Sequence, residues 1–180
     1  MVDGSEDADL VARCVAGDKE AFAPLVDRYQ GPLFTVALRM VRDREDARDI
    51  TQGAFVKAFE KLSTFDPTYR FFSWLYRIAI NECLNFRSRR KPQEALGEEL
   101  ATGETPERHA RAEELSRGIE EALVKLPIEY RVVLVLRHFM DLSYDELSEV
   151  LLIPERTVKS RLYTARQLLA ALLQPWRNES

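Results

Sequence analysis

Apolar residues recur three and four positions apart along most of this chain, the spacing that places them on one face of a helix. Short breaks separate the periodic segments, and most of the 7 Gly and 8 Pro residues fall where a helix would begin or end. Of the 180 residues, 46% are hydrophobic, which is enough for a core. The pattern therefore predicts an all-α protein.

Four helices are predicted in the first half of the chain from residues that cap or end helices. Asp43 is expected to cap a long helix that ends near Leu62, with Asp46 three residues further on, as in a capping box. A last helix runs from about Arg70 to Arg90 and stops before Pro92. The two earlier helices are a short one capped by Ser5 and ended by Gly17, and one capped by Asp18 that Gly31–Pro32 breaks or kinks before Leu33–Val41 continues it.

Helical periodicity is lost over residues 93–112 and resumes near Glu113. We interpret residues 93–112 as a flexible linker that joins two small helical domains, residues 1–92 and 113–180. Residues 93–114 contain seven Glu and two Arg, whereas the charges of the other segments nearly cancel. The net charge of −4 is therefore concentrated in one short segment and does not exclude binding of nucleic acid elsewhere.

Residues 142–169 show the most specific pattern in the chain, that of a helix-turn-helix. Ser143 and Glu146 form a capping box, Leu152–Ile153 makes the turn, and Pro154 is placed at the first position of a second helix. That helix has one inward apolar stripe, consisting of Val158, Leu162, Ala165 and Leu169. Its polar and basic residues are candidates for contacts with a DNA major groove: Arg156, Thr157, Lys159, Ser160, Arg161, Thr164 and Arg166. The alternative is a solvated amphipathic hairpin that packs on another surface.

Residues 65–76 contain six aromatic side chains in twelve positions, with basic residues between and after them. Aromatic rings beside cations can stack and hold single-stranded bases. Such a density of aromatic residues is also typical of a core, and we favour core packing for Phe71 and Trp74. For Phe65 and Tyr69 we favour function. A polar stripe with a period of four runs along the following helix and is either a binding face or a solvated one: Ser73, Arg77, Asn81 and Asn85.

The predicted helix over residues 43–62 has Asp46, Asp49 and Gln52 near one another. An acidic surface of this kind repels DNA, but it could dock a basic helical partner. The alternative is an ordinary solvated face.

The sequence lacks the residue patterns of catalytic, metal and cofactor sites. Cys14 and Cys83 are far apart and form no CxxC motif, and His109 and His138 have no partner at a telling spacing. We therefore expect no enzyme activity, no metal and no cofactor. The acidic N-terminal segment is unlike a signal peptide, and no apolar run approaches the ~20 residues of a membrane span. We expect a soluble, cytoplasmic protein.

Taken together, these segments resemble the extracytoplasmic-function (ECF) sigma factors of bacterial RNA polymerase. Residues 43–92, DREDARDITQGAFVKAFEKLSTFDPTYRFFSWLYRIAINECLNFRSRRKP, resemble sigma region 2. Residues 126–169, LPIEYRVVLVLRHFMDLSYDELSEVLLIPERTVKSRLYTARQLL, resemble region 4. Both segments occur in the order of the family, with its short linker between them, and the resemblance covers nearly all of the chain outside that linker.

The resemblance implies a transcription initiation factor that binds core RNA polymerase, recognises the −35 and −10 promoter elements and assists melting. Asp46, Asp49 and Gln52 match positions that face the clamp helices of the largest polymerase subunit. Residues 63–81 would recognise and help melt the −10 element, through Phe65, Tyr69, Arg70, Phe72, Arg77 and Asn81. The helix at 154–169 would read the duplex −35 element. Family members are commonly held inactive by an anti-sigma factor, often a membrane protein.

Three positions depart from the family pattern. Gln52–Gly53 stands where a Gln–acid pair is usual, and a Gly inside a helix favours a local bend or a close partner contact. Phe65–Asp66–Pro67 replaces the basic residue and Gly that often follow this Phe, and Thr164 replaces a frequent Arg. The −10 and −35 sequence preferences of relatives therefore do not transfer directly.

Two other functions fit parts of the pattern. An ordinary helix-turn-helix repressor or activator would dimerise on a palindromic operator and act without polymerase. A regulatory protein-binding module would use its basic helices on acidic protein partners, and it would show no salt-dependent DNA binding. The aromatic-basic segment and the acidic helix argue against the repressor or activator.

Overall fold

The computed structural model describes residues 4–90 and 118–174, and every regular element in these two ranges is a helix. The N-terminal range contains α1 (Gly4–Val15), the short 3-10 helix η1 (Lys19–Phe22), α2 (Ala23–Val41), α3 (Arg44–Glu60), η2 (Leu62–Thr64) and α4 (Phe71–Arg90). The C-terminal range contains a helical segment over residues 118–125, then α6 (Ile128–Phe139), α7 (Tyr144–Leu151) and α8 (Glu155–Leu172). The expected all-α fold is confirmed. The predicted linker lies outside the described residues.

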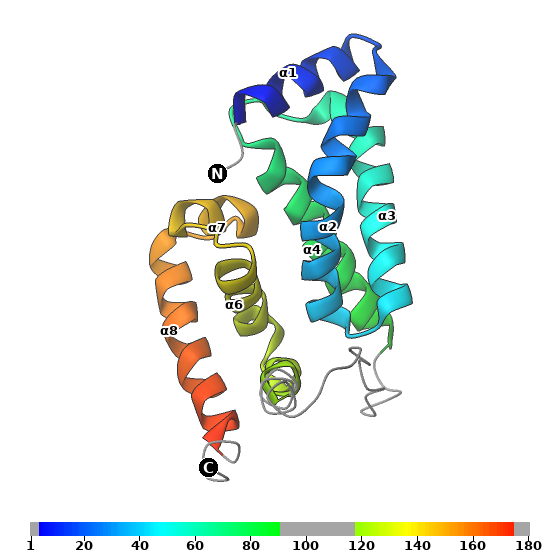
Figure 1. Ribbon diagram of the computed structural model, residues 1–180. Helices are drawn as coiled ribbons and strands as arrows, with labels where there is room; N and C mark the ends of the chain where they lie inside the picture. The colour runs from blue at the N-terminus through cyan, green and yellow to red at the C-terminus, as the bar shows by residue number, and fades with distance from the viewer. Residues whose placement is uncertain (1–3, 91–117, 175–180) are drawn as a thin grey trace, which may run out of the picture.

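Helices α2, α3 and α4 pack together into a bundle, and α1 lies across one end of it (Figure 1). The bundle is held by fully buried apolar side chains such as Leu25, Leu33 and Leu75. Asp7 of α1 is buried and accepts hydrogen bonds from Arg28 and Tyr29 of α2. Because both partners are on α2, this carboxylate fixes where α1 sits on the bundle.

Several predicted helix boundaries in this bundle were wrong. Ser5 lies inside α1 rather than before it. Asp18 makes no capping bond through its side chain, which instead accepts from Arg13 at 2.7 Å. Gly31–Pro32 does not break the second helix, since α2 continues through both residues. Buried side chains on both sides of Pro32 keep this helix on the bundle and outweigh the backbone bond that proline removes.

The caps predicted at Asp43 and Gly17 were correct, and the predicted end of the helix that Asp43 caps was close. Asp43 caps α3, where its carboxylate accepts from the backbone N–H of Asp46 at 2.8 Å. The predicted end of this helix near Leu62 falls two residues late, because α3 ends at Glu60 and η2 follows. Gly17 has a φ of 109°, a conformation that favours glycine at the end of α1. Gly53 lies within an unbroken α3, and a Cβ at this position would meet nothing within 4 Å.

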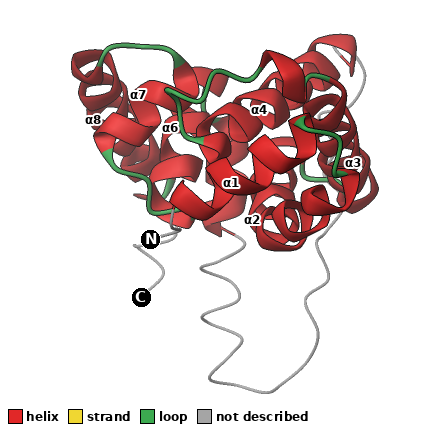
Figure 2. Cartoon of the chain, turned by 90° about the horizontal axis from the view of Figure 1, so that it is seen from above, coloured by secondary structure: helices red, strands yellow, loops and turns green. Residues whose placement is uncertain are grey.

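The C-terminal helices pack directly on the N-terminal bundle, α6 against α2 and α7 against α4 (Figures 1 and 2). Helix α6 lies deep in the core, with Val133, Val135 and Leu136 fully buried. At one point of this contact the Tyr76 hydroxyl of α4 lies 3.3 Å from the Met140 sulfur. One hydrophobic core therefore extends through both groups of helices.

Arg131 of α6 lies completely buried at the contact between α6 and α2. Its guanidinium donates to the carbonyl oxygens of Leu123, Val124 and Leu126, at the end of the helical segment 118–125, and to Met40 of α2 at 3.1 Å. Burial lowers the pKa of Arg131 to about 9, with a contribution from neighbouring arginines. The group stays charged near neutral pH, and it joins the ends of two helices that are far apart in sequence.

Candidate nucleic-acid and polymerase interface

The second half of the C-terminal range is a helix-turn-helix formed by α7 and α8. The capping box is present, with Glu146 N–H donating to the Ser143 hydroxyl at 3.2 Å and Ser143 N–H to the Glu146 carboxylate at 2.7 Å. The turn is closed by Ser148, whose hydroxyl donates to the Ile153 carbonyl at 2.6 Å. Leu152 adopts a left-handed φ of 53° there. Pro154 was predicted at the first position of the second helix, but it lies just before α8, which begins at Glu155.

The inward stripe of α8 is confirmed: Val158, Leu162 and Ala165 are buried, and Leu169 is partly buried against the core. Of the predicted DNA-binding residues, four are exposed and three are half-buried. The exposed ones are Arg156, Lys159, Ser160 and Arg166, and the half-buried ones are Thr157, Arg161 and Thr164. Because the apolar stripe anchors the helix from behind, the opposite face is open to a groove of DNA.

Tyr163 on the open face of α8 was missed by the sequence analysis. Its side chain is 68% exposed, the most exposed large apolar residue in the described chain. It lies three residues after Ser160 and four after Lys159, so all three share one face. The signal was available in the sequence, because the inward stripe already defined which positions point outward.

The loop before α4 is shaped by Asp66, whose carboxylate accepts from the backbone N–H of Thr68 at 2.9 Å and from its hydroxyl at 2.8 Å. These bonds lower the pKa of Asp66. The turn leaves Tyr69 exposed, with the Arg77 guanidinium 6.0 Å from its ring centre.

The aromatic side chains of this segment divide into packed and accessible groups. Phe71 is buried and Trp74 is partly buried, which confirms the expected core packing of these two rings. Phe65 is partly buried and lies 5.3 Å from Trp74 between ring centres, so its own ring forms part of the same cluster. Phe72 is also half-buried, and Asn81 is exposed on α4.

Arg70 and Arg77, both predicted to bind the −10 element, contact α7. The Arg70 guanidinium lies 2.7 Å from Asp145 and 3.2 Å from Glu149, and its backbone N–H donates to Glu149 at 2.7 Å. The hydrogen bond with Asp145 raises the pKa of Arg70, with further contributions from the charges of α7. Arg77 donates to the carbonyl oxygens of Glu149 at 2.6 Å and Val150 at 3.4 Å. Sequence analysis gave no sign of these contacts.

The predicted docking face on α3 contains Asp49 and Gln52, which are exposed, and Asp46, which is half-buried. The structure extends this face with two apolar residues that the sequence analysis missed. Val56 is 57% exposed and Phe59 is 40% exposed, and they follow Gln52 at helical spacings of four and seven. The α3 face therefore combines acidic, amide and apolar groups, a composition suited to a protein partner.

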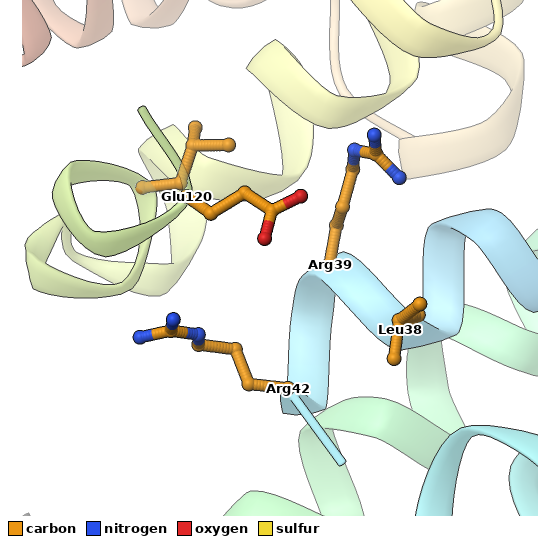
Figure 3. A pocket seen from close by; sticks show the side chains of 5 residues that line it. Leu38, Arg39, Arg42 and Glu120 are labelled. Carbon is orange, nitrogen blue, oxygen red and sulfur yellow. The ribbon is translucent and has the colours of Figure 1, made fainter. Parts of the chain in front are cut away.

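A small cavity of about 10 Å³ lies between α2 and the helical segment 118–125. It is lined by Leu38, Arg39, Arg42, Glu120 and Leu123 (Figure 3). This volume is at the lower limit of what can hold one water molecule. Within the described ranges, no three His, Cys, Asp or Glu side chains come together as a metal site would require. None of the helices described has the length and apolar composition of a membrane span.

The helix-turn-helix and the preceding bundle match two parts of one class of protein, the sigma-70 type of initiation factor. The family model Sigma-70 region 2 matches residues 25–93, and the model Sigma-70, region 4 matches residues 116–169. The chain is 36% identical to the RNA polymerase sigma-H factor of Pseudomonas aeruginosa, with all of both chains covered. It is 36% identical to the ECF sigma factor SigW of Bacillus subtilis, over 88% of this chain and 91% of that protein.

The chain belongs to the ECF sigma factors, and it is a transcription initiation factor rather than an enzyme. Among solved structures, CnrH in complex with the cytosolic domain of CnrY has a TM-score of 0.75 and 30% identity, covering 94% of this chain and 98% of that one. The sigma factor RpoE of Bartonella quintana, in complex with the anti-sigma factor NepR, has a TM-score of 0.68 at 21% identity and shows the shared fold. Membership of the family argues against the repressor or activator alternative.

Proposed function

We propose that this sigma factor uses three separate surfaces: α3 for core RNA polymerase, the loop and first turns of α4 for the −10 element, and α8 for the −35 element. We assign the first two surfaces to a domain of residues 1–92 and the third to a domain of residues 113–180, joined by residues 93–112. The observation that carries the proposal is the open polar face of α8, backed by the buried stripe Val158, Leu162 and Ala165.

The α8 surface suits duplex DNA because its exposed groups are Arg, Lys, Ser and Tyr on a helix anchored from behind. Arg156 and Lys159 lie in its first two turns, the part of a recognition helix that enters the major groove. We assign to the −35 element the residues Arg156, Thr157, Lys159, Ser160, Arg161, Thr164 and Arg166, together with Tyr163.

The loop before α4 suits a single DNA strand because an exposed ring lies beside guanidinium groups. Tyr69 and Arg77 form such a pair. Bases can stack on an aromatic ring while a nearby cation contacts the strand, and this kind of binding depends little on the base sequence. We assign to this strand Phe65, Tyr69, Arg70, Phe72, Arg77 and Asn81.

The α3 surface suits a protein because an acidic end, at Asp46 and Asp49, leads through Gln52 into exposed Val56 and Phe59. We propose that it docks the clamp helices of the largest polymerase subunit. Charged groups there would guide the encounter, and the apolar pair would supply buried area on binding.

We further propose that the factor acts in the cytoplasm, where its polymerase is found, and that an anti-sigma protein holds it inactive. The support is that CnrH, 30% identical to this chain, was solved in complex with the cytosolic domain of CnrY.

The test is transcription in vitro with purified core polymerase and a pool of genomic promoter fragments, with and without the factor. We expect start sites that appear only with the factor and that are lost with Asp49→Arg or with Lys159→Ala. The matched controls are Asp27→Arg, an exposed acid on α2, and Lys125→Ala, an exposed base outside α8. Both controls should retain the start sites. Activity that survives Asp49→Arg would refute the α3 surface, and activity that survives Lys159→Ala would refute its assigned role in α8.

A further inference from the structure

Four arginines lie close together where α2 ends: Arg39 in its last turn, Arg42 at its C-cap, Arg87 from α4 and Arg131 from α6. We call them the arginine cluster. Arg87 and Arg131 both donate to the Met40 carbonyl, at 3.5 and 3.1 Å. Burial lowers the pKa of Arg131, and the charges of Arg87 and Arg42 lower it further. The cluster is therefore a concentration of positive charge at one point of the fold.

Backbone carbonyls account for the positions of Arg87 and Arg131. The last carbonyls of a helix lack intrahelical partners and carry partial negative charge, which favours a cation beside them. Met40 belongs to the last turn of α2 and accepts from both of these arginines. Arg131 also donates to the carbonyls at the end of the segment 118–125. These two side chains therefore need no partner beyond the chain itself.

Arg39 and Arg42 have no such acceptors. The Nε atom of each is buried without a hydrogen-bond partner. Among the residues that the structure describes, neither arginine takes part in an ion pair. The guanidinium of Arg39 lies 3.8 Å from the centre of the Phe139 ring, which offers a π face but no lone pair. A buried N–H without an acceptor costs free energy, so both side chains suit an acceptor that comes from outside the chain.

The backbone conformation of Arg42 supports the same interpretation. Its φ of 62° is left-handed, a conformation that glycine adopts at least cost and that commonly ends a helix. The backbone N–H of Arg42 donates to the Leu38 carbonyl at 2.8 Å, and a glycine could end α2 with the same bond. The arginine instead places a long cationic side chain at the end of α2. Residues in such sparsely populated conformations cluster at ligand-binding positions.

The small cavity between α2 and the segment 118–125 lies against both of these side chains (Figure 3). Its volume, about 10 Å³, admits one oxygen-sized group at most. Figure 3 shows the Glu120 carboxylate directed into the space between Arg39 and Arg42. Glu120 is the single carboxylate that lines the cavity, whereas the nearby arginine cluster has four positive charges. Positive charge is therefore in excess here, and it favours an anion.

We propose that the arginine cluster binds a phosphate group, either free or carried by a small monoester, with one oxygen in the cavity between Arg39 and Arg42. A phosphate group suits this place because it has several acceptor oxygens, and guanidinium groups donate well to such oxygens. One oxygen enters the cavity while the others stay at its mouth, so the whole group does not have to fit inside. The bound group joins α2 to the segment 118–125. No residue that lines the cavity belongs to the surfaces assigned to polymerase or promoter DNA, so the proposal is independent of those assignments.

The first test is thermal unfolding of the full chain in sodium phosphate and in sodium chloride, at equal pH and ionic strength. A ligand that binds only the folded protein raises the melting temperature, by roughly 5–10 °C at about a hundred times its Kd. Phosphate also stabilises most proteins without a site, because it is excluded from their surface. The quantity to compare is therefore the phosphate-dependent rise of each variant. Arg42→Gln should lose most of the rise seen in the wild type, and the control Arg48→Gln, at an exposed arginine of α3, should keep it.

The charge of Glu120 supplies a second test, in which binding becomes tighter. Glu120→Gln removes the negative charge that opposes an anion in the cavity, so the Kd for phosphate, measured by phosphorus NMR, should fall about three- to tenfold. The matched control is Glu121→Gln, at the neighbouring exposed acid, which should leave the Kd unchanged. If Arg42→Gln and Arg48→Gln keep the thermal rise of the wild type, phosphate acts without a site and the proposal is overturned. Equal Kd values for Glu120→Gln and Glu121→Gln would show that the phosphate group does not lie beside Glu120, and would overturn its proposed position.

Phosphorus NMR also distinguishes the two sources of the phosphate group. Inorganic phosphate and adenosine monophosphate are titrated separately with the wild type and with Arg42→Gln, and line broadening reports binding. Broadening of inorganic phosphate alone, lost in Arg42→Gln, identifies the free ion as the ligand. Broadening of both, lost in the same variant, identifies a site that also admits a monoester. No broadening of either at millimolar concentration, or broadening that persists in Arg42→Gln, overturns the proposal.

Discussion

Replacing Arg131 by Met tests the most unusual group in the core, a fully buried guanidinium with no acidic partner among its hydrogen bonds in the described chain. Met keeps much of the length of the side chain and removes the charge and all donors. The carbonyls of Val124 and Leu126 would lose a donor at a helix end. The carbonyl of Leu123 would keep only the backbone N–H of Leu126, at 3.2 Å. Met40 would keep only the longer bond from Arg87, at 3.5 Å.

The expected cost follows from two opposing effects. A buried carbonyl left without a donor costs about 1–3 kcal/mol; this applies to Val124 and Leu126, whereas Leu123 and Met40 each keep a weaker second donor. Removing a buried charge recovers part of this, because the desolvation of an ion costs several kcal/mol. We expect a net loss of roughly 2–4 kcal/mol in the free energy of unfolding, or a melting temperature lower by roughly 5–15 °C.

The measurement is urea unfolding followed by far-ultraviolet circular dichroism, at equal protein concentration. The control is Arg48→Met, an exposed arginine on α3, which should change the free energy of unfolding by less than about 0.5 kcal/mol. If Arg131→Met unfolds within that margin of the wild type, the carbonyls have found other donors, and the reasoning from buried hydrogen bonds is refuted.

Three further outcomes follow from exposure and burial. Val56→Arg should lower the affinity for core polymerase about tenfold or more without changing stability. The control Val15→Arg, at a valine of α1 with nearly the same exposure, should leave that affinity unchanged. Equal polymerase binding by the two variants would exclude Val56 from the interface. Tyr163→Ala should weaken binding to −35 duplex DNA about tenfold, in an anisotropy titration, with helix content unchanged. Burial raises the pKa of Cys83 to about 12, so iodoacetamide should label Cys14 first; mass spectrometry showing the reverse order would contradict this.

The parts of the fold that could be predicted from sequence are those with local causes. The capping box at Ser143 and the cap at Asp43 each depend on residues three positions apart, so the sequence contains the whole interaction. The course of α2 through Pro32 could not be predicted in this way. Proline weakens the helix locally, but the neighbouring turns are held by side chains buried against α3 and α4, and that packing is not visible from local sequence.

The predictions for the candidate site divide in the same way, into local features that could be predicted and long-range contacts that could not. The inward stripe of α8 was predicted because its period is a property of one helix, and Tyr163 follows from the same period once the outward face is defined. The partners of Arg70 could not be predicted, because Asp145 lies 75 residues away in the chain. In a sequence, an arginine beside aromatic residues is equally consistent with DNA binding and with an ion pair to a distant carboxylate. Only the tertiary structure distinguishes these two interpretations.

The contact between the two groups of helices has two parts that should respond differently to salt. The part between α4 and α7 includes an ion pair of exposed groups, Arg70 by 43% and Asp145 by 66%, which water and salt weaken. A second ion pair joins Arg70 to Glu149, which is only 14% exposed and is screened less. The part between α2 and α6 contains apolar packing and the buried bond from Arg131 to Met40, which salt screens far less. Raising the salt concentration should therefore release Arg70 while α6 stays on α2. Complete separation would also require the loss of the apolar packing between α2 and α6 and of the buried bond from Arg131 to Met40.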